Sequence, residues 1–151
     1  MEEELQNRCY NIDLACSEAS VIIPKGEDFN WHIIVGNTNK DDGYKLANMY
    51  SGGKLVQGYG GGVCQVSTTI YGCVRALGLP LKELHHHGLP VDYVDWDKKE
   101  DAAVDDIGGF NFIFTNTTDY DIEIKCYTTE IEENELKERG LLTVEFYKII
   151  Y

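Results

Sequence analysis

The chain has 151 residues, and its 26 acidic side chains outnumber the 13 basic ones, which gives a formal net charge of −13 at pH 7. This charge argues against binding to the phosphate backbone of nucleic acids, which depends on clustered Lys and Arg, and against adsorption to an anionic membrane surface. No stretch approaches the ~20 consecutive apolar residues of a membrane-spanning helix, so we expect no membrane insertion by this segment. The composition, 43% hydrophobic and 26% charged, is typical of a folded protein and predicts one domain over residues 1–151.

A helix is predicted at the start of the chain, because apolar side chains recur there at steps of three and four residues, the spacing of one helix face. These side chains are Leu5, Cys9, Ile12 and Cys16. Short strands are predicted at residues 21–23, before the turn sequence Pro-Lys-Gly, and at residues 29–35. Residues 36–43 are rich in Gly, Asn and Asp and predict a loop. A hairpin is predicted next, with strands at 44–50 and 55–59 around a turn at 51–54.

A second helix is predicted to begin directly after three glycines at residues 60–62. Its apolar face is formed by Val66, Ile70, Cys73, Val74 and Leu77. Gly78 and Pro80 supply the signals that end it.

The second half of the chain predicts mostly strands. They are expected at residues 79–84, 89–94, 101–104, 111–115, 120–128 and 141–151, with a turn at 116–119 and an acidic connection at 130–138. Strands that follow one another with short connections, without a regular β-α-β alternation, favour an antiparallel arrangement. The predicted fold class is therefore α+β, with a mostly antiparallel sheet, an N-terminal helix and a central helix that starts at the Gly-Gly-Gly-Val-Cys-Gln motif.

The cysteines and the N-terminus bear on localisation. Five cysteines, at positions 9, 16, 64, 73 and 126, form no Cys-x-x-Cys pair and are an odd number, so no complete disulfide framework is expected. A pairing of Cys9 with Cys16 stays open. The first four residues, Met-Glu-Glu-Glu, do not form a signal peptide, which would be basic and then apolar. The chain is therefore either cytoplasmic or a domain of a longer exported protein.

Cys64 is the candidate nucleophile, because a cysteine in the first turn of a helix lies at the positive end of the helix dipole, where a thiolate is stabilised. The glycines Gly60, Gly61 and Gly62 would allow a substrate to approach closely and offer N–H groups to an oxyanion. Gln65 adds a side-chain amide beside the thiol. The alternative is that Cys64 is a small buried apolar residue.

Three histidines, His85, His86 and His87, follow in a strand-like segment, where His85 and His87 would share one face and His86 the other. Either His85 or His87 could act as the base for Cys64, with an acidic residue further along the chain as its orienting partner. A zinc site formed by Cys64, His85 and His87 is a third interpretation. We otherwise expect no metal and no cofactor.

At these residues the sequence resembles the VanW family. Residues 60–71, GGGVCQVSTTIY, resemble its GGG[IV]CQ-STT signature, and residues 85–93, HHHGLPVDY, resemble its H-x-H-S-x-P-V-x-Y pattern. Asp101-Ala102 resembles a later D-A pair, and residues 112–118 an F-x-F-x-N-x-T segment. The resemblance implies a Gram-positive, cell-envelope and extracytoplasmic setting and an association with glycopeptide resistance.

The resemblance places the candidate residues on motif positions and leaves two functions open. The first is a cysteine-dependent enzyme that hydrolyses an amide of cell-wall peptide or transfers its acyl group. It would use Cys64 as nucleophile, His87 or His85 as base, Asp101 as orienting residue and Gln65 as oxyanion donor. Substrate contacts are expected at Gly60, Gly61, Gly62, Ser67, Thr68 and Tyr93. The second is a non-catalytic module that binds peptidoglycan or a protein partner.

Overall fold

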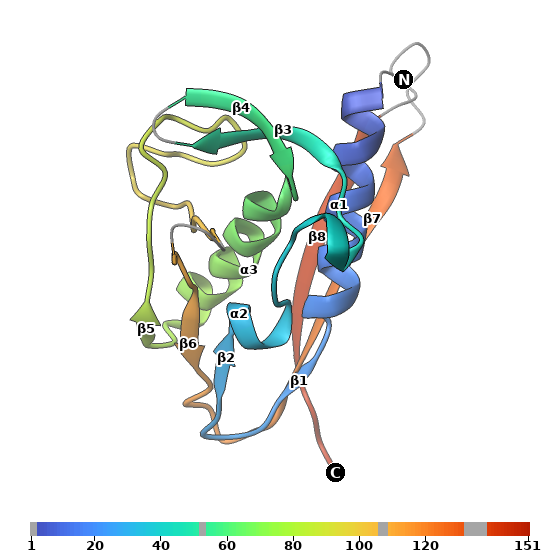
Figure 1. Cartoon of the computed structure of the whole chain (residues 1–151). Helices are drawn as coiled ribbons and strands as arrows, with labels where there is room; N and C mark the ends of the chain where they lie inside the picture. The colour runs from blue at the N-terminus through green and yellow to red at the C-terminus, as the bar shows by residue number, and fades with distance from the viewer. Residues whose placement is uncertain (1–2, 52–53, 106–108, 132–138) are drawn as a thin grey trace.

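The structure is a computed structural model that describes residues 3–51, 54–105, 109–131 and 139–151. Over these residues it has an α+β fold with three α-helices and three small antiparallel sheets (Figure 1). The predicted fold class is confirmed, although the strands are divided over three sheets. Residues 52–53 of the predicted hairpin turn and residues 132–138 of the predicted acidic connection lie outside the described residues.

Helix α1 (Glu3–Ala19) confirms the helix predicted at the start of the chain. It buries Asn11, Ile12, Ala15, Cys16 and Ala19. The helix packs against the first sheet, in which β1 (Ile22–Ile23), β7 (Ile122–Ile131) and β8 (Arg139–Lys148) lie in the order β1-β7-β8 (Figure 1). Strands β7 and β8 confirm the last two predicted strands, with bounds shifted by a few residues.

The second sheet has the order β2-β6-β5 and consists of β2 (Asp28–Asn30), β6 (Ile113–Thr115) and β5 (Leu81–Glu83). Its side chains Phe29 and Phe114 are fully buried, and their rings stack with centroids 5.0 Å apart. Phe112 is buried against both. This aromatic cluster joins the sheet to the buried face of the central helix, so the core is continuous.

The strand predicted at residues 29–35 is wrong beyond Asn30, where the chain turns into the short helix α2 (Trp31–Ile34). The Asn30 side chain accepts a hydrogen bond from the backbone N–H of Ile33 and so caps the helix. Asn111 donates to the same oxygen at 2.8 Å. The apolar run at residues 29–35 is therefore divided between a strand and a helix at Asn30, whose side chain is held by Asn111, a residue far along the chain.

The third sheet is the predicted hairpin, formed by β3 (Leu46–Ser51) and β4 (Lys54–Tyr59). It leads through the three glycines into α3 (Val63–Leu77), which confirms the predicted central helix. Gly78 ends this helix in the left-handed conformation, with φ of 64°. In Figure 1 the hairpin lies across the end of the molecule at which α3 begins.

The strands predicted at residues 89–94 and 101–104 are not regular strands. Residues 92–99 form turns, since Pro90 has no N–H for a sheet and the Trp96 indole donates back to the carbonyl of His87 at 3.0 Å. Residues 101–104 have one backbone hydrogen bond to the histidine segment, in which the N–H of Ala103 donates to the carbonyl of His85. They also contact α3.

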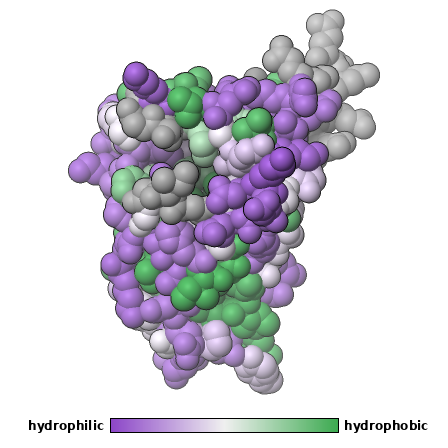
Figure 2. Space-filling view, viewed as in Figure 1, coloured by the Kyte–Doolittle hydropathy of each residue, from purple (hydrophilic) through white to green (hydrophobic). Residues whose placement is uncertain are grey.

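The surface in Figure 2 is mainly hydrophilic, with an apolar area at the level of α2 in Figure 1. Helix α2 carries Ile33, whose exposed fraction is 79%. Among the helices that the structure describes, none is long and apolar enough to span a lipid bilayer.

Candidate functional site

The three glycines form a tight connection between β4 and α3 that is packed against the chain itself. Gly60 and Gly62 have positive φ angles of 84° and 106°, which favour glycine. A side chain at Gly61 would place its Cβ 2.5 Å from the backbone of Ala47. The buried amide of Asn11 donates to the carbonyl of Gly61 at 3.0 Å and so ties this connection to α1. The three glycines are therefore explained by backbone conformation and by close packing within the protein itself.

Cys64 lies in the first turn of α3, and its side chain forms hydrogen bonds with both the N–H and the carbonyl of Val104. The thiol donates to the carbonyl of Val104 at 3.3 Å, and Sγ accepts from the N–H of Val104 at 3.5 Å. The thiol therefore satisfies the two backbone groups of Val104 that a neighbouring strand would otherwise bind.

Thr68, one helical turn after Cys64, makes the same kind of contact with Ala102. Its hydroxyl accepts from the N–H of Ala102 at 2.9 Å and lies 3.2 Å from the carbonyl of Ala102. Ser67 donates to that carbonyl at 2.7 Å. Side chains of α3 thus bind alternate residues of the segment 101–104, so Ser67 and Thr68, predicted to contact substrate, have structural partners.

We predict that Thr68→Val lowers the free energy of unfolding by about 1–3 kcal/mol, since it leaves the buried N–H of Ala102 without its acceptor while preserving shape. The matched control is Thr69→Val, because the Thr69 hydroxyl donates within its own helix, to the carbonyl of Gln65. We expect that control to change stability by less than about 0.5 kcal/mol. Urea unfolding followed by circular dichroism measures both, and equal effects would contradict the bridging role.

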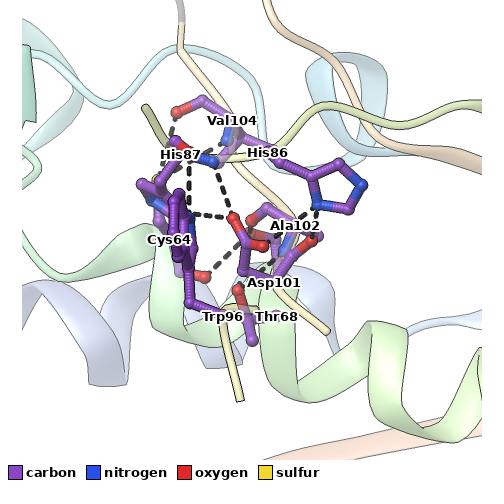
Figure 3. A network of polar contacts seen from close by, with 9 residues as sticks. Cys64, Thr68, His86, His87, Trp96, Asp101, Ala102 and Val104 are labelled. Atoms are coloured by element: carbon purple, nitrogen blue, oxygen red, sulfur yellow. Dashed lines mark hydrogen bonds and ion pairs between the residues drawn. The ribbon is translucent and has the colours of Figure 1, made fainter. Parts of the chain in front are cut away.

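Asp101 is fully buried between two imidazole rings (Figure 3). Its Oδ2 accepts from the backbone N–H and from Nδ1 of His87, both at 2.7 Å, and its Oδ1 lies 3.0 Å from Nδ1 of His86. Burial alone would raise the pKa of Asp101, but the hydrogen bonds from His87 and His86 outweigh it and hold the pKa below its ordinary value. The carboxylate is therefore stably ionised.

The tautomers of both histidines follow from their partners. Carboxylate and carbonyl oxygens only accept, so Nδ1 of His87 and Nδ1 of His86 carry protons. In the neutral ring of His87, Nε2 is then the basic nitrogen. The His87 side chain is 6% exposed and lines a pocket beside the start of α3. The structure thus brings Asp101 and His87 together beside the start of α3.

His85 does not join this group. Its Nε2 lies 2.8 Å from Oε2 of Glu83, and its ring stacks on Phe110 with centroids 4.3 Å apart. The prediction that His85 and His87 share a face, with His86 opposite, is wrong, because the segment is not a strand and His86 joins His87 at Asp101. Among the described residues, no group of three or more His, Cys, Asp or Glu side chains could hold a metal ion, so the three ligands of the zinc interpretation are not assembled.

A pocket of about 690 Å³ opens beside the start of α3, between the β3–β4 hairpin and α1. Cys64, Gln65, His87 and Tyr93 line it together with Gly60 and Gly62. The Oε1 atom of Gln65 accepts from Arg8 at 2.8 Å. Gly61, Ser67, Thr68 and Asp101 are not among its lining residues. Some of the predicted site residues therefore line the pocket, whereas Asp101, Ser67 and Thr68 hydrogen-bond to residues next to it or in its lining.

The pKa values of two pocket side chains, Cys64 and Tyr93, are raised, whereas a reactive thiol requires a lowered pKa. Burial raises the pKa of Cys64 to about 11, although the backbone hydrogen bond to Val104 lowers it. Burial likewise raises the pKa of Tyr93, with a further increase from Cys64. The sequence predicts a stabilised thiolate at the helix start, and the structure gives the opposite direction.

Several residues of the site carry no local sequence signal. Asn11, Arg8 and Val104 reach it from distant segments, and nothing in their immediate sequence predicts this. His86 is part of the histidine cluster, but its contact with Asp101 depends on an irregular backbone. Trp96, whose indole bonds to the His87 carbonyl, holds the loop around the histidines.

A comparison with protein families settles what the motifs resemble, since a family model described as VanW like protein matches residues 7–137. The chain belongs to the VanW-like family. Two relatives give the VanW-like chain its context. It is 34% identical over 123 residues to "Uncharacterized protein YoaR" of Bacillus subtilis (strain 168), a match that covers 80% of this chain and 39% of that protein.

The second relative of the VanW-like chain is "Vancomycin B-type resistance protein VanW" of Enterococcus faecalis (strain ATCC 700802 / V583). The identity is 33% over 67 residues, covering 44% of this chain and 24% of the relative. The chain thus spans less than half of the length of either relative. No solved structure matches it.

Proposed function

We propose that this VanW-like chain is a binding module of the bacterial cell envelope that holds a cell-wall peptide in the pocket beside α3. The observation that carries the proposal is the pocket itself, whose volume of about 690 Å³ lies in the ordinary range of ligand sites. The envelope setting rests on the family, in which one relative is named as a vancomycin resistance protein.

The lining of the pocket supports a ligand with both apolar and charged groups. Apolar side chains come from α1, the hairpin and α3, and they are Leu5, Met49, Leu55, Tyr59 and Val63. Arg8 supplies a guanidinium, which has further N–H donors besides the one that Gln65 accepts. Glu4, Asp92 and Asp105 supply carboxylates. A peptide presents carboxylate, ammonium and apolar groups together and therefore complements this lining.

The binding proposal also accounts for the chemistry of Cys64. A thiol with a raised pKa and two bonds to Val104 is suited to hold the pocket wall, since Val104 lines the pocket as well. Asp101 has the same kind of role, because it positions His87 at the pocket from behind. On this proposal the motif residues hold the walls of a binding site in position.

The test is isothermal titration calorimetry of the full chain with a soluble muropeptide that carries a free ammonium group. Asp92→Asn removes a carboxylate from the pocket, and Asp97→Asn is the matched control, because both residues are exposed and Asp97 does not line the pocket. We expect Asp92→Asn to weaken binding about fivefold at low salt, and the control to leave it unchanged. Absence of binding by the unaltered chain, both to the muropeptide and to sedimented peptidoglycan, would refute the proposal.

A second candidate function is acyl transfer or amide hydrolysis, favoured by the presence of Cys64 and of the Asp101-bound His87 in one pocket. Sγ of Cys64 would attack the carbonyl carbon of the peptide, and its proton would pass to Nε2 of His87 and then to the leaving amine. Intact-mass spectrometry after incubation with the muropeptide would then detect an acyl adduct. The adduct should be lost in Cys64→Ala and kept in Cys73→Ala, and its absence in the unaltered chain rejects this candidate.

A further inference from the structure

Two cysteines outside the pocket meet where α1 packs on β7. Cys16 of α1 is 2% exposed, and Cys126 of β7 is 7% exposed. Their thiols are hydrogen-bonded to each other, which raises the pKa of Cys126, and burial adds to the effect. The pocket and its proposed ligand do not involve either residue.

The backbones of the two cysteines are held together by a single hydroxyl. Ser20 donates to the carbonyl of Cys16 at 2.8 Å and lies 3.2 Å from the carbonyl of Cys126, and it accepts from the N–H of Cys126 at 3.0 Å. The Ser20 hydroxyl therefore holds the backbone of Cys16 beside that of Cys126. A disulfide needs side chains that face each other on neighbouring segments, and the contact between the two thiols meets this need.

We propose that Cys16 and Cys126 are a modification site, at which a disulfide oxidant converts the two thiols into an intramolecular disulfide that joins α1 to β7. The oxidant is a small-molecule disulfide, because thiols that are 2% and 7% exposed do not admit a protein-sized partner. The thiolate of one cysteine attacks a sulfur of the oxidant, forms a mixed disulfide and releases one thiol. The other cysteine then attacks the protein sulfur of that mixed disulfide and releases the second thiol. Two protein thiols are oxidised and one external disulfide is reduced.

The other cysteines are placed less favourably for this reaction. Cys9 and Cys16 are separated by about 10 Å of helix rise, beyond the ~7 Å between Cα atoms that a disulfide tolerates, so the pairing left open by the sequence does not form while α1 is intact. Cys73 lies near enough to affect Cys126, but its thiol donates to the carbonyl of Val144. Cys64 is bonded to Val104.

The cross-link should make unfolding harder, because it closes a chain segment of roughly 100 residues and so restricts the unfolded state. We expect the oxidised chain to unfold about 10 °C above the reduced chain. Since the pKa of Cys126 is raised, the oxidation should also speed up with increasing pH.

The experiment treats the reduced full chain with oxidised glutathione, blocks remaining thiols with N-ethylmaleimide and digests without reduction, using a protease that cleaves after Asp and Glu. Cleavage at Asp13 separates Cys9 from Cys16, so the expected product is residues 14–18 linked to residues 124–130. Cys16→Ala should abolish this product, and Cys9→Ala, the matched control on the same helix, should retain it.

The mass map of the unaltered chain decides the matter without any variant. The linked peptide together with the rise in unfolding temperature supports the proposal. Glutathione adducts on separate cysteines, a link from Cys126 to the peptide that contains Cys73, or five alkylated thiols would each overturn it.

Discussion

Replacing Asp101 by alanine is expected to lower the free energy of unfolding by about 2–6 kcal/mol, because two buried donors of His87 lose their acceptor at a cost of about 1–3 kcal/mol each. The carboxylate is fully buried and accepts three hydrogen bonds from His86 and His87. Its loss leaves the backbone N–H and the ring N–H of His87 without their acceptor, while the ring of His86 keeps the backbone carbonyl of Asp101. Asp97→Ala is the control, because Asp97 is exposed, and chemical unfolding of both variants measures the difference.

The pH dependence of this effect follows from the pKa of Asp101. Because that pKa is lowered in the folded state, the carboxylate contributes stability above the ordinary Asp value of about 3.9, and the contribution is lost as the pH falls through the lower folded value. The stability difference between the unaltered chain and Asp101→Asn should therefore be large near neutral pH and shrink below about pH 4. A difference that grows on acidification would contradict the buried ionised carboxylate.

Gly61→Ala is expected to cost about 3 kcal/mol of stability, at the upper end of the range for overpacking. The added Cβ would lie 2.5 Å from the carbonyl group of Ala47 and 2.7 Å from the carbonyl oxygen of Asn48. These neighbours are backbone atoms of β3, so no side-chain rotation relieves the contact. The pocket should distort as well, because Gly60 and Gly62 on either side line it.

Gly72→Ala supplies the control for this substitution in the same region. Gly72 lies inside α3, and the nearest atom to an added Cβ is the guanidinium of Arg75 at 3.7 Å. We expect this variant to gain about 0.5–1 kcal/mol, since alanine is the better helix former. Thermal unfolding of the two variants should move in opposite directions, and a loss of the same size in both would contradict the close packing at Gly61.

The elements that the sequence predicts correctly are those whose signals are local. The apolar periodicity and end signals of α1 and α3, and the alternation along β7 and β8, depend on neighbouring residues alone. The strand expected at residues 29–35 fails because Asn30 caps α2 with the help of Asn111. The strand expected at residues 89–94 fails because Trp96 bonds back to His87. Both errors arise from contacts between segments.

For the candidate site too, the sequence predicts the local features and misses the contacts between distant segments. The motif identifies Cys64, Gln65 and His87 as residues that share a region, and the pocket contains them. The sequence does not reveal that the side chains of Cys64 and Thr68 each hydrogen-bond to both the N–H and the carbonyl of one residue in the segment 101–104. Such pairing between a helix and a distant segment has no periodic signature. The motif predicts Cys64 as nucleophile and Ser67 and Thr68 as substrate contacts, and in the structure the side chains of all three hydrogen-bond to residues 102 and 104.

The most direct test of this view is the pH dependence of Cys64 alkylation by iodoacetamide, followed by peptide mass spectrometry on the full chain. The structure predicts slow reaction at neutral pH and a rate that reaches half of its maximum near the thiol pKa of about 11, with little change in His87→Ala. Rapid alkylation with a midpoint well below ~8.5, the ordinary value of a free thiol, that is lost in His87→Ala would contradict the framework role and identify Cys64 as an activated nucleophile.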